Sequence, residues 1–170
     1  MSSPVRTAGQ QQSVVGLLNV NIAVLLGAYG FEILGGLAPC LLCYYQRGPY
    51  FLAIMLCSAA WFRPGWGRTV FAILMVVYLA GAGLGAYHAG VEWKFWPGPA
   101  SCTALDSSDV PIEELMARIL AAPIVRCDEI PWSLFGISLA GYNALISLGL
   151  LTLSALALRQ GNRRHNDERA

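Results

Sequence analysis

The stretch Pro39-Cys40-Leu41-Leu42-Cys43-Tyr44-Tyr45-Gln46-Arg47 lies at the junction of two apolar runs, residues 13–37 and 44–62. It places two thiols at this junction, with a guanidinium group four residues after the second thiol. A helix of about 20 apolar residues is long enough to cross a bilayer. The stretch therefore predicts two membrane helices joined by a short turn that carries a Cys-x-x-Cys motif.

The composition extends this prediction to the whole chain. Of its 170 residues, 56% are hydrophobic and only 12% are charged, whereas about a quarter of the residues of soluble domains are charged. Two further apolar runs cover residues 69–89 and 132–158. We therefore expect an all-α membrane protein in which residues 1–170 form one domain, a four-transmembrane-helix bundle with outward loops at 38–43 and 90–131.

The distribution of positive charge predicts the orientation. An even number of spans leaves both termini on one side of the membrane. That side holds seven of the eleven basic residues: Arg6, Arg63, Arg68, Arg159, Arg163, Arg164 and Arg169. By the positive-inside rule both termini are cytoplasmic, so the Cys-x-x-Cys motif and the 90–131 loop face outward.

A cleaved signal peptide is a second interpretation of the N-terminus, with Arg6 as its charged region. The apolar run 13–37 is longer than the roughly 7–15 residues of a signal-peptide core. Pro39 also stands where a cleavage site needs a small residue. We therefore expect this run to be a retained span.

The loop 90–131 is too long for a simple connection. Within it, the apolar residues of 111–120 recur at helical spacing, which puts them on one face of a helix with the charged residues on the other. The apolar residues are Ile112, Leu115, Met116, Ile119 and Leu120. This pattern predicts a short amphipathic helix, which either lies flat on the membrane or packs onto its own loop. Cys102 and Cys127 flank it.

Two features of the spans have different implications. The small residues of 81–86, Gly-Ala-Gly-Leu-Gly-Ala, predict close helix packing and no chemistry. Glu32 lies near the outer end of the first span. An acid within a span indicates a functional site, but a wetted carboxylate at the surface is the alternative.

Four of the five cysteines face outward in this topology. In a Gram-negative bacterium this side is the oxidising periplasm, where Cys40 with Cys43 and Cys102 with Cys127 form two natural pairs. The second pair could be merely structural. The first closes almost no loop, and its spacing is typical of redox-active or metal-binding thiols. Cys57, in mid-span, is expected to be a small buried hydrophobe.

The surroundings of Cys43 predict a reactive thiolate. A helix N-terminus and Arg47, one turn further along the same face, would both lower the pKa of Cys43, although Arg47 could instead snorkel to the surface. A membrane quinone is the nearest two-electron acceptor. His88, at the outer end of the third span, lies at a similar depth to Arg47, so the two side chains could together hydrogen-bond a quinone oxygen.

The motif Cys40-Leu41-Leu42-Cys43 with Arg47, between the first two of four spans and followed by a long loop with a second cysteine pair, resembles the DsbB family. The resemblance covers residues 14 to 158. These proteins are multi-pass disulfide bond formation proteins of the bacterial inner membrane that act as thiol:quinone oxidoreductases, with ubiquinone or menaquinone as acceptor.

The resemblance also implies a relay. A DsbA-like periplasmic thioredoxin-fold oxidase would form a mixed disulfide at Cys102, and Cys127 would pass the electrons to Cys40. Cys43 would then form the adduct with the quinone. Arg47 and His88 match the family's quinone-site arginine and histidine. Gln46 stands where an acid is familiar in the family, and no role is predicted for it.

Three alternatives remain. A thiol-based metal-binding or transport protein would use the same outward sulfurs, although the wide spacing of the second pair differs from compact metal-ligand spacing. A structural membrane subunit would leave the Cys-x-x-Cys and Arg47 without a purpose. A vitamin K epoxide reductase type of protein would carry its Cys-x-x-Cys late in the chain. No nucleic-acid partner is expected.

Overall fold

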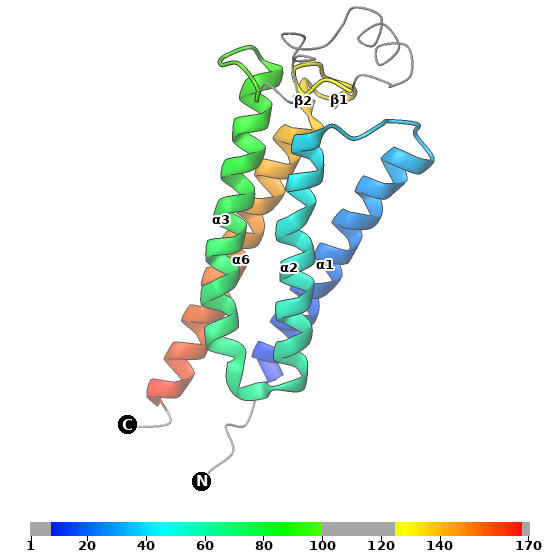
Figure 1. The fold of residues 1–170 in the computed structure, drawn as a ribbon. Helices are drawn as coiled ribbons and strands as arrows, with labels where there is room; N and C mark the ends of the chain where they lie inside the picture. Colours follow the sequence, from blue (N-terminus) through cyan, green and yellow to red (C-terminus); the bar gives the residue numbers. More distant parts are fainter. Residues whose placement is uncertain (1–7, 100–124, 168–170) are drawn as a thin grey trace, which may run out of the picture.

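The computed structural model describes residues 8–99 and 125–167. Its helices are α1 (Ala8–Ile33), α2 (Leu41–Phe62), α3 (Gly67–Glu92) and α6 (Leu139–Asp167), with a 3-10 turn at Pro64–Trp66 between α2 and α3. The four helices run side by side as an elongated bundle, as Figure 1 shows. The start of α1 and the end of α6 lie at one end of it, and the α1–α2 connection and the β1–β2 hairpin lie at the other. This places the Cys-x-x-Cys motif at the end opposite the start of α1 and the end of α6.

Three helices are long and apolar enough to cross a membrane: Gly9–Ile33, Gly67–Glu92 and Leu139–Gly161, with mean hydropathies of 1.9, 2.1 and 1.6. They confirm a helical membrane protein. The second helix, α2, does not meet the same criterion, because its outer part contains Gln46, Arg47 and Pro49 among tyrosines. The fourfold span count therefore stays a prediction. Large apolar side chains on the outer faces, such as Leu26 and Phe62, are exposed as lipid-facing residues would be.

The first predicted span ends earlier than expected. The apolar run continues to Leu37, but α1 stops at Ile33. Gly36 adopts a φ of +67°, a conformation that costs glycine little and ends many helices. The backbone N–H groups of Gly35 and Leu37 then bond back to the carbonyls of Gly30 and Phe31, at 3.2 and 3.1 Å.

The start of the fourth predicted span is wrong. Residues 133–138, placed in that span by their apolarity, form a two-stranded antiparallel hairpin, β1 (Ser133–Leu134) with β2 (Ile137–Ser138). Phe135 and Gly136 at its turn both have positive φ, +50° and +78°, as a tight two-residue hairpin turn requires. The helix α6 begins only at Leu139.

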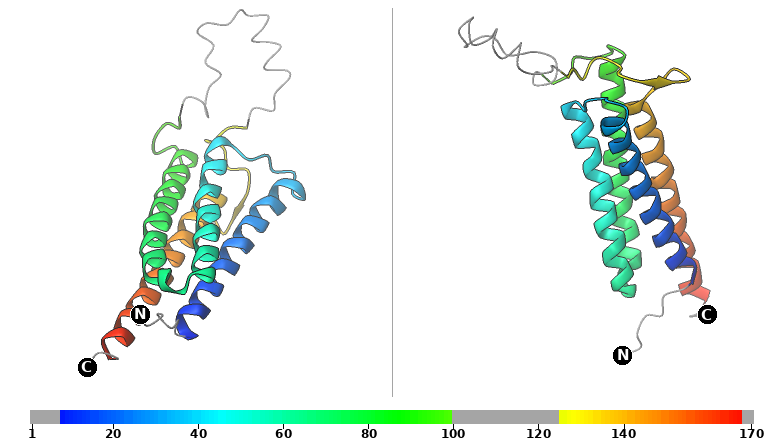
Figure 2. Two further views of the ribbon diagram at one scale, coloured as in Figure 1. Left: turned by 60° about the horizontal axis from the view of Figure 1, so that its bottom comes forward. Right: turned by 90° about the vertical axis from the view of Figure 1, so that its right-hand side faces the viewer.

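The small residues of α3 pack as expected. A Cβ added to Gly85 would lie 2.8 Å from the backbone nitrogen of Ala144 in α6, so the two backbones approach as closely as a glycine allows. The helix pair α3–α6 has the most extensive contact in the bundle, while α2 packs against both α1 and α3. The two further views in Figure 2 show the same four helices side by side. The outer end of α2 is thereby held against the outer end of α3.

The predicted amphipathic helix at 111–120 lies outside the described residues, as does Cys102. Cys57 is fully buried in the apolar core that the four helices share. This position confirms the expectation that it is a packing residue.

Candidate functional site

The site begins with the local structure of the Cys-x-x-Cys motif. Cys40 is the N-cap of α2, with φ −76° and ψ 173°, and its sulfur accepts the backbone N–H of Cys43 at 3.3 Å. The two sulfurs are 3.0 Å apart, and both are free thiols. A cysteine at an N-cap supplies the acceptor that serine or aspartate more often provides. The helix start therefore fixes the position of both thiols.

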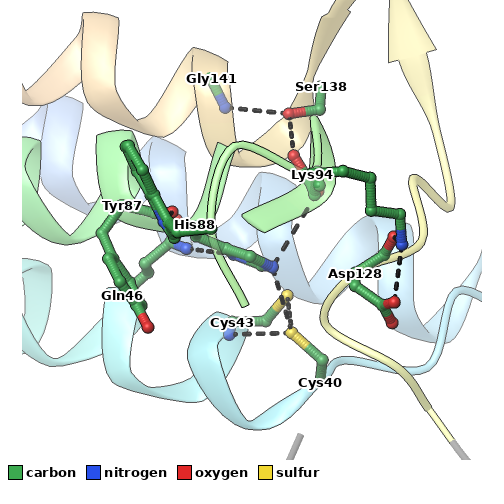
Figure 3. A network of polar contacts seen from close by, with 11 residues as sticks. Cys40, Cys43, Gln46, Tyr87, His88, Lys94, Asp128, Ser138 and Gly141 are labelled. Atoms are coloured by element: carbon green, nitrogen blue, oxygen red, sulfur yellow. Dashed lines mark hydrogen bonds and ion pairs between the residues drawn. The ribbon is translucent and has the colours of Figure 1, made fainter. Parts of the chain in front are cut away.

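His88 reaches this pair from α3. Its Nε2 lies 3.6 Å from the sulfur of Cys40, and the side chain is buried. On the other side of the ring, Nε2 of Gln46 lies 2.5 Å from Nδ1 of His88. An amide nitrogen can only donate, so Nδ1 is the acceptor and a neutral ring carries its proton on Nε2. Figure 3 shows the ring between Gln46 and Cys40.

A buried carboxylate lies next to the same ring nitrogen. Oε1 of Glu92, one helical turn after His88, is 4.0 Å from Nε2. The hydroxyl of Ser138 donates to Oε2 of Glu92, while its oxygen accepts the N–H of Gly141 at 3.2 Å and so caps α6. Both Glu92 and Ser138 are buried. Sequence reasoning missed this pair, although the spacing of His88 and Glu92 puts them on one helix face.

The second cysteine pair enters the site through Cys127. This residue is fully buried and disulfide-bonded, and its expected partner, Cys102, lies outside the described residues. The sulfurs of Cys40 and Cys127 and a ring nitrogen of His88 lie within 4.8 Å of one another. Leu42 and Val91 pack around the two cysteines. The site thus brings Cys127 together with the Cys40–Cys43 pair in largely apolar surroundings.

The segment that carries Cys127 is held by ion pairs. Asp128 is 2.6 Å from the ammonium of Lys94 and 2.8 Å from the guanidinium of Arg126. The hydrogen bonds from Arg126 and then from Lys94 keep the pKa of Asp128 below its usual range. Figure 3 shows Lys94 and Asp128 beside the cysteine pair. The Lys94 contact ties the residue after Cys127 to the end of α3.

The arrangement of the two thiols differs from the predicted one in which Cys43 has the low pKa. The two sulfurs are 3.0 Å apart, and when Cys40 is the thiolate the thiol of Cys43 donates to it. This hydrogen bond, helped by His88 and opposed by burial, lowers the pKa of Cys40 from 9.0 to about 4. The same hydrogen bond and burial raise the pKa of Cys43. In the dithiol state, Cys40 therefore holds the thiolate.

Arg47 points the other way, toward α1. Its Nη2 lies 2.7 Å from Oε2 of Glu32, and its guanidinium stacks near the rings of Tyr29 and Tyr44, at 4.5 and 5.2 Å. Nη1 of Arg47 is buried and has no hydrogen-bond partner. Among the described residues no contact joins Arg47 to His88, because adjacent positions 46 and 47 of α2 face different helices.

This set of groups can exchange disulfides. It contains a stabilised thiolate, a histidine that offers an N–H to sulfur, and a second disulfide close by. Two thiols and an imidazole could also ligate a metal. In this state, however, the sulfur of Cys127 is bonded to another sulfur and is not a thiolate ligand.

Comparison with known proteins identifies relatives over most of the chain. The family model described as "Disulfide bond formation protein DsbB" matches residues 10–157. The Disulfide bond formation protein B of Alkalilimnicola ehrlichii is 29% identical over 152 residues, which cover 85% of this chain and 91% of that protein. The Disulfide bond formation protein B 2 of Pseudomonas syringae is 30% identical over 147 residues, with 81% and 82% covered. No solved structure matches the chain significantly.

Proposed function

This chain belongs to the DsbB family of disulfide bond formation proteins, and from this membership we propose that it is a membrane thiol:quinone oxidoreductase. In this function it reoxidises a DsbA-type thioredoxin-fold dithiol oxidase and passes the electrons to a membrane quinone. Family membership supports the disulfide-generating oxidoreductase activity as such. We propose in addition that the electron acceptor is a quinone, that the partner is a DsbA-type oxidase, and that the electrons pass through both cysteine pairs.

The observation that carries the proposal is the approach of the two cysteine pairs. The sulfur of Cys40 lies within 4.8 Å of the sulfur of Cys127, and both are buried in a cluster with Leu42 and Val91. Thiol–disulfide exchange needs a thiolate in line with a disulfide sulfur. A structural disulfide has no need to lie against a Cys-x-x-Cys motif at a helix N-terminus.

The proposed exchanges balance in atoms and electrons. A thiolate of the reduced partner attacks Cys102, and the bond between Cys102 and Cys127 breaks with the electron pair on Cys127. Cys127 attacks Cys40, and the electron pair moves to Cys43. The second thiolate of the partner then attacks the partner's own sulfur in the mixed disulfide and releases Cys102. Cys102 attacks Cys127, which restores the bond between them and returns an electron pair to Cys40. The Cys40–Cys43 pair would be reoxidised by a quinone, so overall the partner loses two electrons and two protons and becomes a disulfide, while the quinone gains them and becomes a quinol. Once Cys40 is bonded to Cys127, Cys43 no longer has a thiolate to donate to, and it becomes the thiolate itself.

The fit of a quinone is best judged at Arg47. The buried Nη1 of Arg47 has no hydrogen-bond partner among the described residues, and the rings of Tyr29 and Tyr44 lie close to the guanidinium. A quinone carbonyl would satisfy this donor, and its flat ring suits an aromatic surround. Cys43 is one helical turn before Arg47, on the same face. When bound there, the quinone supplies a two-electron acceptor at the edge of the membrane.

The sequence predicts His88 as a second quinone ligand, but its contacts favour a role at the cysteines. The ring is held between Gln46 and Cys40, so it acts on the sulfurs more directly than on a quinone at Arg47. We propose Arg47 as the main quinone-binding residue. Ubiquinone and menaquinone both present the carbonyl that this site would bind.

The orientation belongs to the same proposal. The α1–α2 connection, which leads into the Cys-x-x-Cys motif, lies at the end of the bundle opposite the start of α1 and the end of α6, and Cys127 lies against this motif. With the termini in the cytoplasm of a bacterial cell, this end faces the periplasm, where a DsbA-type partner is found. The chain would then be a multi-pass protein of the inner membrane.

An anaerobic titration tests the proposal. Purified full-length protein in detergent receives one equivalent of quinone and increasing amounts of a reduced DsbA-type dithiol, while quinone absorbance and thiol count are followed together. We expect one quinone to be lost per partner disulfide formed. The variant Cys43→Ser should lose this reaction. The variant Cys57→Ser, which alters a buried cysteine outside the site, is the matched control and should retain it.

The same experiment examines the metal-binding alternative, which the cluster of Cys40, His88 and Cys127 favours in geometry. In a parallel sample without partner, Zn²⁺ is added to the fully reduced protein. Absence of quinone loss together with tight binding of Zn²⁺ would replace the oxidase by a metal-binding protein.

A further inference from the structure

The buried polar residues around His88 are not explained by the relay itself. Gln46, Glu92 and Ser138 are buried at the outer end of the bundle, where each costs free energy unless it is hydrogen-bonded. All three belong to one network of contacts that runs from Gln46 through His88 and Glu92 to Ser138. Among the described residues, none of the three is hydrogen-bonded to a cysteine.

We propose that Gln46 and Glu92 are positioning residues that hold His88 with its Nε2–H directed at the sulfurs of Cys40 and Cys127, so that this N–H stabilises the thiolate present during disulfide exchange. The inference rests on the proposed function for its context. It assigns roles to two residues that contact His88, one of which, Glu92, is itself held by Ser138.

Gln46 sets the tautomer. Its amide donates to Nδ1 at 2.5 Å, so a neutral His88 has its proton on Nε2. The same nitrogen is the one that lies 3.6 Å from Cys40. Without Gln46 the proton could occupy either nitrogen, and the ring could turn.

Glu92 is the second acceptor for the same N–H. A sulfur in a disulfide accepts hydrogen bonds poorly, so Nε2–H would lose its partner each time Cys40 is oxidised, and a buried unpaired donor is costly. Oε1 of Glu92 lies 4.0 Å from Nε2, close enough to accept after a small movement of the ring. Ser138 fixes the other carboxylate oxygen. Glu92 thus keeps His88 in place through both redox states of Cys40.

The exchange itself balances without moving the histidine proton. Cys127 thiolate attacks Cys40, the Cys40–Cys127 bond forms, and the Cys40–Cys43 bond breaks with its electron pair on Cys43. In the reverse direction the electron pair returns to Cys127. One disulfide replaces another, so no electron is gained or lost, and the proton stays on Nε2 as a hydrogen-bond donor.

The groups that face Cys40 come from three segments. They are Cys43 on α2, His88 and Glu92 on α3, and Cys127 before the hairpin. Lys94 and Asp128 stand nearby and neutralise each other. Among the described residues, loss of the His88 N–H would therefore leave Cys43 and the helix N-terminus to stabilise a thiolate at Cys40.

Alkylation of the reduced protein tests the inference without quinone or partner oxidase, so its result is independent of the proposed function. Full-length protein in detergent is reduced anaerobically and treated with iodoacetamide over a range of pH, and each cysteine peptide is quantified by mass spectrometry. In Gln46→Leu and in Glu92→Leu we expect the midpoint pH of Cys40 alkylation to rise by about one unit. At pH values below the midpoints of both proteins, Cys40 of the variant is then alkylated about tenfold more slowly than Cys40 of the wild type.

The conservative variant Glu92→Gln should keep the wild-type profile, because the amide oxygen can also accept Nε2–H. Gln12→Leu on α1 and Glu129→Leu near the hairpin alter exposed residues and should leave Cys40 unchanged. Cys57, fully buried in the core, reports on folding in every sample and should stay unreactive.

Two results would overturn the inference. One is an unchanged Cys40 profile in Gln46→Leu and Glu92→Leu while Cys57 stays protected. The other is a Glu92→Gln variant that behaves like Glu92→Leu, because charge and not hydrogen bonding would then be decisive. If Cys57 becomes reactive in a leucine variant, that variant is not correctly folded, and Gln46→Asn is tested in its place. This side chain is one methylene too short to reach Nδ1, and an unchanged Cys40 profile in it would equally overturn the inference.

Discussion

Arg47 of α2 and Glu32 of α1 form an ion pair, with Nη2 2.7 Å from Oε2, at the outer end of the bundle. Sequence reasoning considered Arg47 a quinone ligand and Glu32 either a functional acid or a wetted carboxylate. The structure connects them. Glu32 holds one side of the guanidinium, so that Nη1, buried and without a partner, is left for a ligand.

This pair predicts the effect of removing the acid. In Glu32→Gln the guanidinium loses its charged partner and its fixed orientation, so we expect KM for quinone to rise several-fold with a smaller change in kcat. The free energy of unfolding should fall by about 1 kcal/mol, because the carboxylate is partly exposed and such pairs contribute little. Steady-state kinetics with a soluble quinone and thermal unfolding in detergent measure the two effects.

A double-mutant cycle with Arg47→Gln separates the ion pair from the individual residues. The exposed acid Glu129 provides the control, and Glu129→Gln should change neither quantity. Equal effects of Glu32→Gln in the presence and absence of Arg47 would contradict the orienting role.

Much of the fold could be predicted because it depends on run length. Apolar runs of bilayer length identified α1, α3 and α6 as spans, and glycine spacing in 81–86 predicted the close α3–α6 contact. The errors lie where apolarity was the only signal. Residues 133–138 are apolar enough for a span, but two consecutive positive φ angles at Phe135 and Gly136 turn them into a hairpin.

The sequence was enough to identify the cysteines of the candidate site, but not the polar contacts around them. The spacing of Cys40 and Cys43 singled them out, and His88 was found by its depth in the membrane. Which face of α2 meets which helix could not be read from one sequence, so Arg47 was paired with His88 instead of Glu32. Gln46 occupies the position next to Arg47 and takes the contact with His88. Ser138 lies 46 residues beyond its partner Glu92, and no local pattern relates the two.

The α3–α6 contact predicts different results for two glycines of one helix. In Gly85→Ala the new Cβ would lie 2.8 Å from the backbone nitrogen of Ala144. The helices must then separate, at a cost of about 1–3 kcal/mol of stability. Gly83→Ala adds a Cβ with nothing within 4 Å, and should be neutral or stabilising by up to about 1 kcal/mol. Thermal unfolding of both variants in one detergent compares them, and equal effects would contradict the close approach.

The low pKa of Cys40 predicts a pH dependence that exists only in the reduced protein. The pKa of this thiol is 9.0 in the unfolded chain and about 4 in the folded one, so between these values the unfolded chain binds a proton that the folded chain does not. Stability therefore rises with pH across this window. The contribution is complete above about pH 9 and is lost as the pH falls through about 4. In protein oxidised at Cys40 and Cys43 it should be absent.

Unfolding midpoints of the reduced and oxidised forms, measured at a series of pH values, give this contribution as their difference. Cys43 also titrates only in the reduced form, but its raised pKa keeps it protonated in the folded chain, and in the unfolded chain it is largely protonated below about pH 9, so it contributes little across this window. In samples that keep Cys127 disulfide-bonded, the remaining groups are common to both forms and cancel. The variant Cys43→Ala, in which Cys40 loses its principal hydrogen-bond donor, should show a smaller difference from its own alkylated control. A constant difference between reduced and oxidised wild-type protein would contradict the assignment of the thiolate to Cys40.

The approach of Cys40 to Cys127 predicts which disulfide forms when Cys43 is removed. In Cys43→Ala the free thiolate of Cys40 lies within 4.8 Å of a sulfur that is already in a disulfide. Exchange should therefore produce a Cys40–Cys127 bond and release Cys102. Peptide mapping under non-reducing conditions would identify this bond. The matched variant Cys40→Ala keeps Cys43, whose sulfur is not part of the cluster at His88, and should yield much less of the corresponding Cys43–Cys127 bond. Equal yields from the two variants would mean that Cys40 has no privileged access to Cys127, and the order of the proposed relay would have to change.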